Sequence, residues 1–433
     1  MRKKVAIIGA SVGGLISAKL LQSKGYNVTI FEKSNSVGGM YSKVDTPFGR
    51  FELGMHVLYV NDEQREVLYE LYGVDYFLER NGTDVDLGAS FFDNQLYMNS
   101  IYPNIINTRY ATTVLKHLSD EKSTRDIIPY NVVEALKIRF GSEYTIDIAV
   151  KILEGLWGTE ANLLSEGAIH SFYDLRRVVA VGQEEAIKLK KNKDFDNVIA
   201  WPDQTNVIGK IFDNRTALFF KYLDKEPFIV SKIEDNDINL SLNQNIYLKN
   251  DEFYSNDLNL NKDYDAMILT APIHSLIEKD MEEKIDYGKL AIYYFELENS
   301  IKDSVPVYYV LGHDENVLFS RMVNYDAYNE DYPKKVISAE VLYSDIEPDV
   351  QQVIEGVEKV HPSIKVKNHY KYPNVLKVPL PTVKNHELFQ EQILRIKNNL
   401  KEKYFKDSGM RTDLGRFFSH DTIREAYNAT LEL

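Results

Sequence analysis

The sequence predicts an α/β protein with more than one domain. Three observations support this: a β-α-β pattern opens the chain, residues 110–200 are patterned mainly as helices, and closely spaced strand patterns occur between residues 286 and 385. At 433 residues the chain is too long for one simple core. Its 44% hydrophobic and 27% charged residues match an ordinary globular protein, so we expect two or three domains.

The β-α-β unit contains a glycine-rich turn. Residues 4–8 (KVAII) are patterned as a buried strand, a helical stripe follows, and residues 27–33 (NVTIFEK) are patterned as a second strand. Glycines at such a turn let the backbone approach a pyrophosphate whose charge rests on the helix N-terminus. The unit therefore predicts a Rossmann-like dinucleotide-binding domain. The turn residues of the predicted site are Gly9, Ser11, Gly13 and Gly14.

The second strand ends on an acidic residue at the spacing that this motif requires. Glu32 follows the turn by about 20 residues, where a carboxylate accepts hydrogen bonds from ribose hydroxyls. We include its neighbour Lys33 in the predicted cofactor site. Ser11 occupies the middle glycine position, where its Cβ narrows the approach while its hydroxyl can bond a phosphate. A glycine-rich helix start with no ligand is the alternative.

A second glycine pair indicates which dinucleotide is bound. Residues 34–44 (SNSVGGMYSKV) contain Gly38, Gly39 and Met40, and resemble the second glycine pair of FAD proteins of the amine oxidase and protoporphyrinogen oxidase type. In those families this stretch lies along the flavin side of the cofactor. The resemblance implies that FAD, rather than NAD, is the cofactor.

Residues 51–59 (FELGMHVLY) are similar to the next segment of that FAD pattern. The resemblance implies that Gly54 and Met55 pass close to the isoalloxazine and that His56 lies near it as a candidate catalytic residue. A half-buried, hydrogen-bonded His56 is the alternative.

The remaining chain leaves the dinucleotide domain and returns to it. Residues 68–79 predict a helix that closes near Gly73 and then a short strand, Trp157 is expected in the core, and residues 386–405 predict a helix. The predicted order is residues 1–85 for the first part of a discontinuous FAD-binding domain, 86–205 for a mainly helical insert, 206–262 for a mixed segment partly in the FAD domain, 263–285 for the return, 286–385 for an antiparallel-sheet substrate domain, and 386–433 for C-terminal helices of the FAD domain.

Several later segments resemble UDP-galactopyranose mutases. Residues 286–298, 319–328 and 415–431 are similar to that family's aromatic-acid strand, arginine strand and closing Gly-Arg signature. The resemblance implies that Arg321 holds the substrate diphosphate and that Gly415, Arg416 and Asp421 lie against the cofactor. The family's tyrosines in the closing signature are absent here, where FFSHD follows Arg416.

Two enzymatic hypotheses follow. The resemblance implies a redox-neutral ring isomerisation of a sugar or nucleotide sugar by flavin N5 chemistry, with reduced FAD active and Arg176 or Arg177 as a second diphosphate clamp. The alternative is an FAD-dependent oxidoreductase of the amine oxidase or protoporphyrinogen oxidase type. A structural ion pair for Arg321 and a solvated surface position for Arg176 remain open.

The composition limits which kinds of partner and cofactor the protein is expected to bind. The net charge of −14 disfavours nucleic acid and anionic membranes, and no apolar run approaches the roughly 20 residues of a membrane helix. The absence of cysteine excludes disulfides and thiol catalysis and fits a reducing cytoplasm. The nine histidines are scattered in the sequence, so no metal site is expected. The sequence therefore predicts a cytoplasmic enzyme for a small-molecule substrate, with its oligomeric state undetermined.

Overall fold

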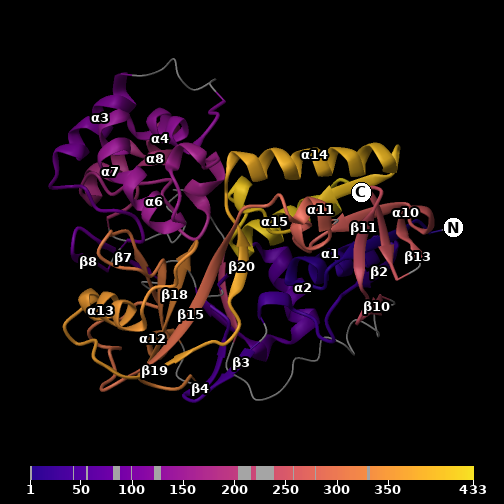
Figure 1. Cartoon of the computed structure of the whole chain (residues 1–433), viewed down its shortest axis with the longest axis horizontal. Helices are drawn as coiled ribbons and strands as arrows, with labels where there is room; N and C mark the ends of the chain where they lie inside the picture. The colour runs from indigo at the N-terminus through magenta and orange to yellow at the C-terminus, as the bar shows by residue number, and fades with distance from the viewer. Residues whose placement is uncertain are drawn as a thin grey trace.

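A computed structural model shows three parts arranged around a central cavity region (Figure 1). The helical insert lies above the antiparallel sheet, and the dinucleotide domain, with both chain termini, lies beside them. The structure describes residues 2–41, 43–54, 57–80, 88–98, 100–120, 128–202, 216–220, 238–256, 258–277, 279–328 and 332–433. The candidate residues Met55 and His56 lie outside the described residues.

A five-stranded parallel sheet forms the dinucleotide domain. β1 (Lys4–Ile8) lies between β2 (Asn27–Phe31) and β14 (Ala266–Leu269), and β10 (Asn239–Ser241) and β21 (Tyr404–Asp407) form the edges. Every neighbouring pair is parallel. The strands come from three distant parts of the chain, within residues 4–31, 239–269 and 404–407, so the predicted discontinuous, Rossmann-like domain is confirmed.

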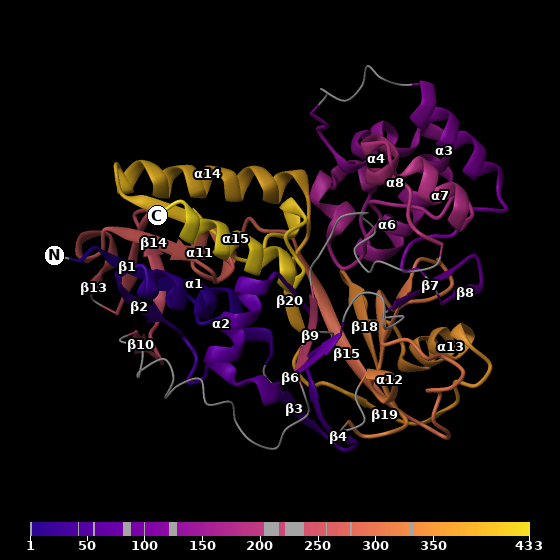
Figure 2. The same ribbon diagram turned by 180° about the vertical axis from the view of Figure 1, so that it is seen from behind.

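Helices cover this sheet and fix the turn that follows β1. α1 (Val12–Ser23) packs against α15 (Ser419–Leu431), where a Cβ on Gly13 would lie 3.2 Å from the Ala426 Cβ. The Ser17 hydroxyl donates to the Ala426 carbonyl at 2.9 Å across the same contact. The small residue at position 13 therefore lets the C-terminal helix lie close to the first helix (Figure 2).

The end of the chain differs from the sequence-based prediction. α14 (Val383–Leu400) ends before the predicted residue 405, because Lys401 adopts a φ of +56° that stops the helix. Tyr404 and Phe405 then belong to strand β21 beside β14. The helical prediction was wrong there because an apolar pair in a strand edge shares its spacing with the preceding helical stripe.

The second sheet is mainly antiparallel and has eight strands. Its order is β19 (Val366–Lys371), β15 (Tyr287–Leu297), β18 (Val336–Tyr343), β17 (Arg321–Asn324), β16 (Tyr309–Gly312), β7 (Gly88–Phe92) and β8 (Gln95–Tyr97), and β20 (Leu376–Pro379) also pairs with β15. Only the β16–β7 pair in this described sheet is parallel. α13 (Val350–Val360) covers one face of the sheet with a separate apolar core.

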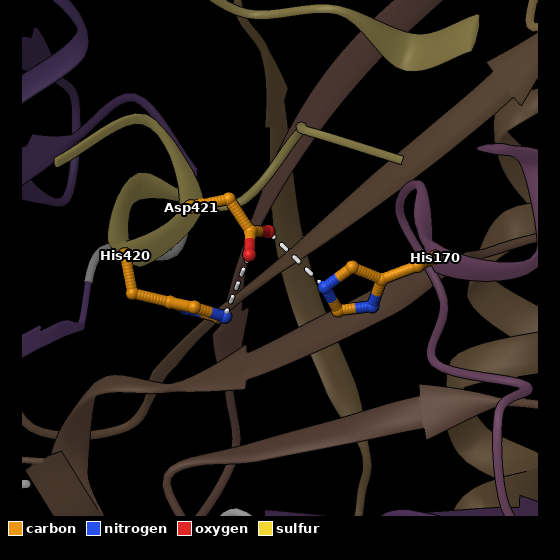
Figure 3. Close-up of side chains that lie close together, drawn as sticks. All are labelled: His170, His420 and Asp421. Atoms are coloured by element: carbon orange, nitrogen blue, oxygen red, sulfur yellow. Dashed lines mark hydrogen bonds and ion pairs between the residues drawn. The ribbon is translucent and has the colours of Figure 1, made fainter. Parts of the chain in front are cut away.

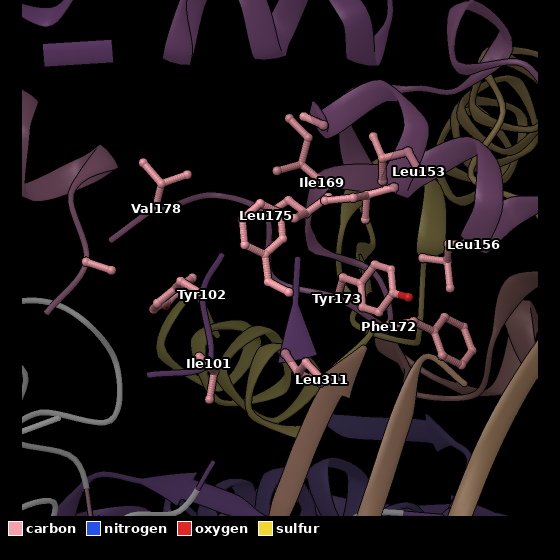
Figure 4. Packing of buried hydrophobic residues seen from close by; sticks show 14 of the residues in the cluster. Ile101, Tyr102, Leu153, Leu156, Ile169, Phe172, Tyr173, Leu175, Val178 and Leu311 are labelled. Atoms are coloured by element: carbon pink, nitrogen blue, oxygen red, sulfur yellow. The ribbon is translucent and has the colours of Figure 1, made fainter. Parts of the chain in front are cut away.

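The helical insert packs on the other end of this sheet. Its helices are α3 (Arg109–Asp120), α4 (Val132–Phe140), α5 (Ser142–Tyr144), α6 (Val150–Trp157), α7 (Gln183–Leu189) and α8 (Lys193–Val198). Trp157 is buried edge-on against Phe172, as core packing requires. Leu153, Leu156 and Ile169 of the insert lie over the region of Leu311 (Figure 4). The first strands of the predicted insert range, β7 and β8, belong to the antiparallel sheet instead of the helical layer.

Smaller elements flank the two large sheets. α2 (Asp62–Tyr72) ends at Gly73 and is followed by β6 (Phe77–Arg80), as the pattern of residues 68–79 predicts. β5 (Leu58–Val60) and β6 pair with β9 (Thr216–Phe220), β3 (Lys43–Thr46) pairs with β4 (Gly49–Glu52), and β11 (Ile246–Lys249), β12 (Glu252–Ser255) and β13 (Leu258–Asn259) form a third small sheet. Among the described helices, none combines the length and apolar character that crossing a bilayer requires.

Candidate active site

A cavity of about 430 Å³ runs between the parallel sheet and the antiparallel sheet. One end is lined by Gly9, Ser11 and Glu32, which follow β1 and β2. The other end is lined by Tyr309 and Arg321 of the antiparallel sheet. The cavity therefore joins the carboxyl ends of the parallel strands, where open α/β sheets bind ligands, to the second domain.

The turn between β1 and α1 places backbone atoms without side chains at the cavity wall. Gly9 has a φ of +106°, and a Cβ on it would lie 2.8 Å from the Ala271 nitrogen. A Cβ on Gly14 would lie 2.3 Å from the Gly9 carbonyl oxygen, which no real side chain tolerates. The Ser11 hydroxyl accepts a hydrogen bond from the Gly14 N–H at 3.2 Å and caps α1. The turn itself therefore requires glycine at positions 9 and 14.

The second glycine pair lies beside the first turn. The Gly38 N–H donates to the Ala10 carbonyl at 2.8 Å. A Cβ on Gly38 would meet no atom within 4 Å, one on Gly39 would be in ordinary contact with Ser11 at 3.7 Å, and both glycines line the cavity. These two turns form a cradle of backbone that fits the pyrophosphate of a dinucleotide. Met40 follows in a short 3₁₀ helix, and Lys33 also lines the cavity.

Glu32 has two backbone partners that the sequence did not predict. One carboxylate oxygen accepts from the Ala10 N–H at 2.8 Å and the other from the Ser34 N–H at 2.8 Å. These bonds hold the carboxylate at the cavity wall, and each oxygen keeps a further lone pair. The arrangement lets Glu32 accept hydrogen bonds from hydroxyl groups of a bound ribose.

Arg321 is in a buried ion pair on the cavity wall. It lies directly opposite Glu340 in the β17–β18 ladder, and its Nη2 lies 2.7 and 2.6 Å from the two Glu340 oxygens. The two residues are only 5% and 1% exposed. A Cβ on Gly54 would lie 2.8 Å from Glu340 Oε1, so this glycine gives the carboxylate its space. The guanidinium charge is therefore neutralised by the chain.

Arg176 is paired in the same way. Its Nε and Nη2 donate to the two oxygens of Asp174 at 2.9 and 2.7 Å, and both residues line the cavity. The Tyr102 hydroxyl donates to the same carboxylate at 3.2 Å. Burial opposes ionisation of Asp174, yet Arg176 and the nearby His170 hold the pKa of this carboxyl well below its usual range. Arg176 and Asp174 are therefore both ionised, and their opposite charges cancel.

The C-terminal candidates lie behind the cavity wall. Gly415 has a φ of +65° and lies against Gly167 of the insert. Arg416 donates from Nε to the Gly409 carbonyl at 2.6 Å, from Nη1 to the Asp407 carbonyl at 2.9 Å and from Nη2 to the Asp407 carboxylate at 2.5 Å. These bonds brace the segment between β21 and α15, which carries the wall residues Phe417 and Phe418 and leads to His420 in the first turn of α15.

Asp421 joins two histidines into a cluster that the sequence did not predict (Figure 3). His170 Nε2 lies 3.1 Å from Asp421 Oδ2, and His420 Nε2 lies 3.6 Å from Asp421 Oδ1. Burial opposes ionisation of Asp421, but His420, His170 and Arg424 hold its pKa well below the usual range. Because His170 and Asp421 are about 250 positions apart, no sequence spacing could reveal the cluster.

Most of the remaining cavity wall is apolar. Three polar or charged groups described above, the Arg321–Glu340 pair, the Arg176–Asp174 pair and the His170–His420 cluster, interrupt this surface. Its aliphatic and aromatic side chains include Leu53, Val57, Ile101, Leu290, Ile292, Leu311, Leu376, Phe417 and Phe418. Such a wall excludes water from a ligand and strengthens the electrostatic effect of the few polar groups.

The fold and the cavity together define a class: a protein with a discontinuous Rossmann-like domain and a ligand-sized cavity between that domain and an antiparallel sheet. Comparison with known proteins agrees with this class. Residues 7–73 match the family described as NAD(P)-binding Rossmann-like domain. A 4,4'-diapophytoene desaturase (4,4'-diaponeurosporene-forming) of Staphylococcus aureus strain MRSA252 is 37% identical over 73 residues, which cover 17% of this chain and 14% of the desaturase.

Two solved structures share the fold over nearly the whole chain. A reduced UDP-galactopyranose mutase aligns with a TM-score of 0.66 at 14% identity, over 99% of this chain and 94% of the mutase. A putative protoporphyrinogen oxidase from Exiguobacterium sp. 255-15 aligns with a TM-score of 0.55 at 14% identity, over the full length of both chains. At this level of identity the similarity concerns the fold.

Proposed function

We propose that the protein is an FAD-dependent oxidoreductase that oxidises a largely apolar small molecule. The observation that carries the proposal is the cavity, which continues from the glycine turns to an apolar chamber in which both candidate arginines are neutralised. When bound, FAD supplies a hydride acceptor. The similarity of residues 34–44 to FAD proteins and the shared fold with a putative protoporphyrinogen oxidase support this cofactor.

The residues of the chain divide the work between the two ends of the cavity. The backbone around Gly9 and Gly38 would hold the pyrophosphate, and Glu32 would hold the ribose. The apolar wall would bind the substrate and exclude water from it. This division requires no charged clamp for the substrate.

The charge balance favours an apolar substrate over a nucleotide sugar. A diphosphate needs cations whose charge is not already compensated, because an anion gains little from an arginine that shares a bidentate carboxylate. Arg321 and Arg176 are both bound in that way by Glu340 and Asp174. To clamp a diphosphate, each would have to leave its buried partner.

A second candidate function is the redox-neutral isomerisation of a sugar or nucleotide sugar. The observation that favours it is the fold similarity to reduced UDP-galactopyranose mutase, whose TM-score of 0.66 exceeds that of the putative protoporphyrinogen oxidase. Under this hypothesis the FAD works in its reduced form, and His56, Arg321 and Arg176 remain the candidate catalytic residues.

One anaerobic experiment separates the two functions. The purified, flavin-loaded protein is mixed with a panel of apolar amines, polyenes and porphyrinogens without reductant, and separately with UDP-galactopyranose in the presence and in the absence of dithionite. We expect the 450 nm flavin band to bleach with a member of the apolar panel. Formation of a ring-contracted sugar only in the dithionite sample would instead support the mutase. A Gly155→Ala protein serves as control, because a Cβ there meets no atom within 4 Å.

A further inference from the structure

We propose that His170, His420 and Asp421 bind one divalent transition-metal ion of the zinc class on the wall of the cavity. Two imidazole nitrogens and a carboxylate are a ligand set that such ions prefer. The inference goes beyond the proposed function and is independent of it, because none of the three residues belongs to the glycine cradle that would hold the dinucleotide.

Potential ligand atoms of the three residues lie close together. Figure 3 shows both Nε2 atoms directed at the Asp421 carboxylate, at 3.1 Å for His170 and 3.6 Å for His420. One potential ligand atom from each of the three residues lies within 4.8 Å of the other two. An ion about 2.0 to 2.2 Å from each ligand needs ligand atoms roughly 3.3 Å apart, so the side chains would move closer together on binding it.

The surroundings of His170 place a second carboxylate on the side of the ring that faces away from Asp421. A metal on Nε2 leaves the proton on Nδ1, and metal-bound histidines generally direct that N–H at a carboxylate. The His170 Nδ1 is buried and has no hydrogen-bond partner among the described residues, and it faces Asp174 Oδ1 at 3.8 Å. Asp174 is itself fixed by the bidentate bonds from Arg176. Asp174 is therefore placed as a positioning residue behind the ligand.

The other two ligands are held in place as well. The His420 ring stacks on Phe418 with an interplanar angle of 8° and meets Tyr59 edge-on. Arg424 Nη2 lies 3.1 Å from Asp421 Oδ1, which leaves Oδ2 to face His170. A carboxylate that binds a metal through one oxygen commonly accepts a hydrogen bond on the other. The cluster is thus organised before an ion arrives.

The cavity supplies the open side of the site. His170 and His420 both line the cavity, whereas Asp421 lies behind them. Three protein ligands with the remaining position open to a cavity are typical of catalytic rather than structural zinc sites. A metal here would bind an oxygen or nitrogen atom of a molecule in the cavity and polarise it.

Zinc binding to the full-length protein tests the proposal. The chelator-treated protein is titrated with ZnCl₂ by calorimetry. In parallel, Co²⁺ is added to flavin-free protein, and the d–d absorption of the bound ion is recorded. We expect one equivalent of Zn²⁺ per chain and a Co²⁺ spectrum that Zn²⁺ abolishes. His420→Asn and His170→Asn should each weaken Zn²⁺ binding at least tenfold, and Asp174→Asn should weaken it about 10- to 100-fold. His369→Asn, which removes an exposed histidine on β19, should change nothing.

The alternative is a hydrogen-bond network that only ties the insert to α15. It is favoured if the native protein binds no Zn²⁺ at tenfold molar excess, or if His420→Asn binds as much as the native protein does; either result overturns the proposal. Folding of each variant is checked by circular dichroism. Should His170→Asn fail to fold, the His420→Asn and Asp174→Asn titrations decide the question, because these side chains contribute through different elements.

Discussion

Breaking the Arg321–Glu340 pair should be costly, whereas replacing both partners should not. Arg321→Met removes three contacts of 3.1, 2.7 and 2.6 Å and leaves the Glu340 carboxylate, 1% exposed, without its cation. Removal of one partner of a buried pair costs about 3 to 5 kcal/mol. We expect Arg321→Met to lose that much free energy of unfolding.

The double variant separates a structural pair from a substrate clamp. Arg321→Met/Glu340→Leu fills the same volume with apolar groups, and such replacements are commonly neutral or stabilising. We therefore expect its free energy of unfolding to return to within about 1 kcal/mol of the native value, measured by guanidinium denaturation followed by far-UV circular dichroism.

Two results would refute this reasoning. If Arg321→Met loses less than about 1 kcal/mol, the pair does not neutralise a buried charge. If the double variant is as unstable as the single variant, Arg321 stabilises the sheet through contacts other than Glu340. Either result would also mean that Glu340 does not keep Arg321 from binding a diphosphate.

Three further outcomes follow from the structure. Gly14→Ala should lower flavin content several-fold, because the new Cβ would lie 2.3 Å from the Gly9 carbonyl oxygen. Glu32→Gln should weaken binding of FAD to the apoprotein about 10- to 100-fold, since hydrogen bonds to charged groups contribute about 1.5 to 3 kcal/mol. Burial lowers the pKa of His313 from 6.5 to about 4. Between pH 6.5 and pH 4 this histidine is therefore protonated in the unfolded chain and neutral in the folded chain. Stability should fall by about 3 kcal/mol from His313 alone as pH falls from 6.5 to 4.

Matched controls accompany these variants. Gly155→Ala should keep its flavin and gain up to about 1 kcal/mol as a helix substitution. Glu298→Gln, at an exposed position, should leave the FAD dissociation constant unchanged. His313→Gln should flatten the stability profile between pH 6.5 and 4. Unchanged flavin in Gly14→Ala, unchanged affinity in Glu32→Gln or an unchanged profile in His313→Gln would contradict the corresponding argument.

The dinucleotide domain could be predicted because its signals are local. The strand, turn and helix around Gly9 and Gly14 lie within one short segment, and Glu32 follows at a fixed distance. At this turn a side chain on Gly9 or Gly14 would clash with the neighbouring backbone, so glycine is required at both positions. Local patterning was insufficient where the chain passes from a helix directly into a strand. At Lys401 a positive φ ends α14, and the chain then enters a strand of the parallel sheet.

The partners of the site residues could not be predicted from sequence. Arg321 meets Glu340 only because β17 and β18 pair in that register, and a shift of one residue would send the two side chains to opposite faces. His170 reaches Asp421 through packing of the insert against the C-terminal segment. Such contacts depend on tertiary geometry, which periodicity and spacing do not encode.

The central claim is that FAD occupies the cavity beside the first turn. Mass spectrometry of the small molecules released by denaturing the purified protein, together with its visible spectrum, tests this most directly. We predict a yellow protein that releases FAD in about one equivalent per chain. A colourless protein that releases no flavin and takes up none from an excess of FAD would contradict the account.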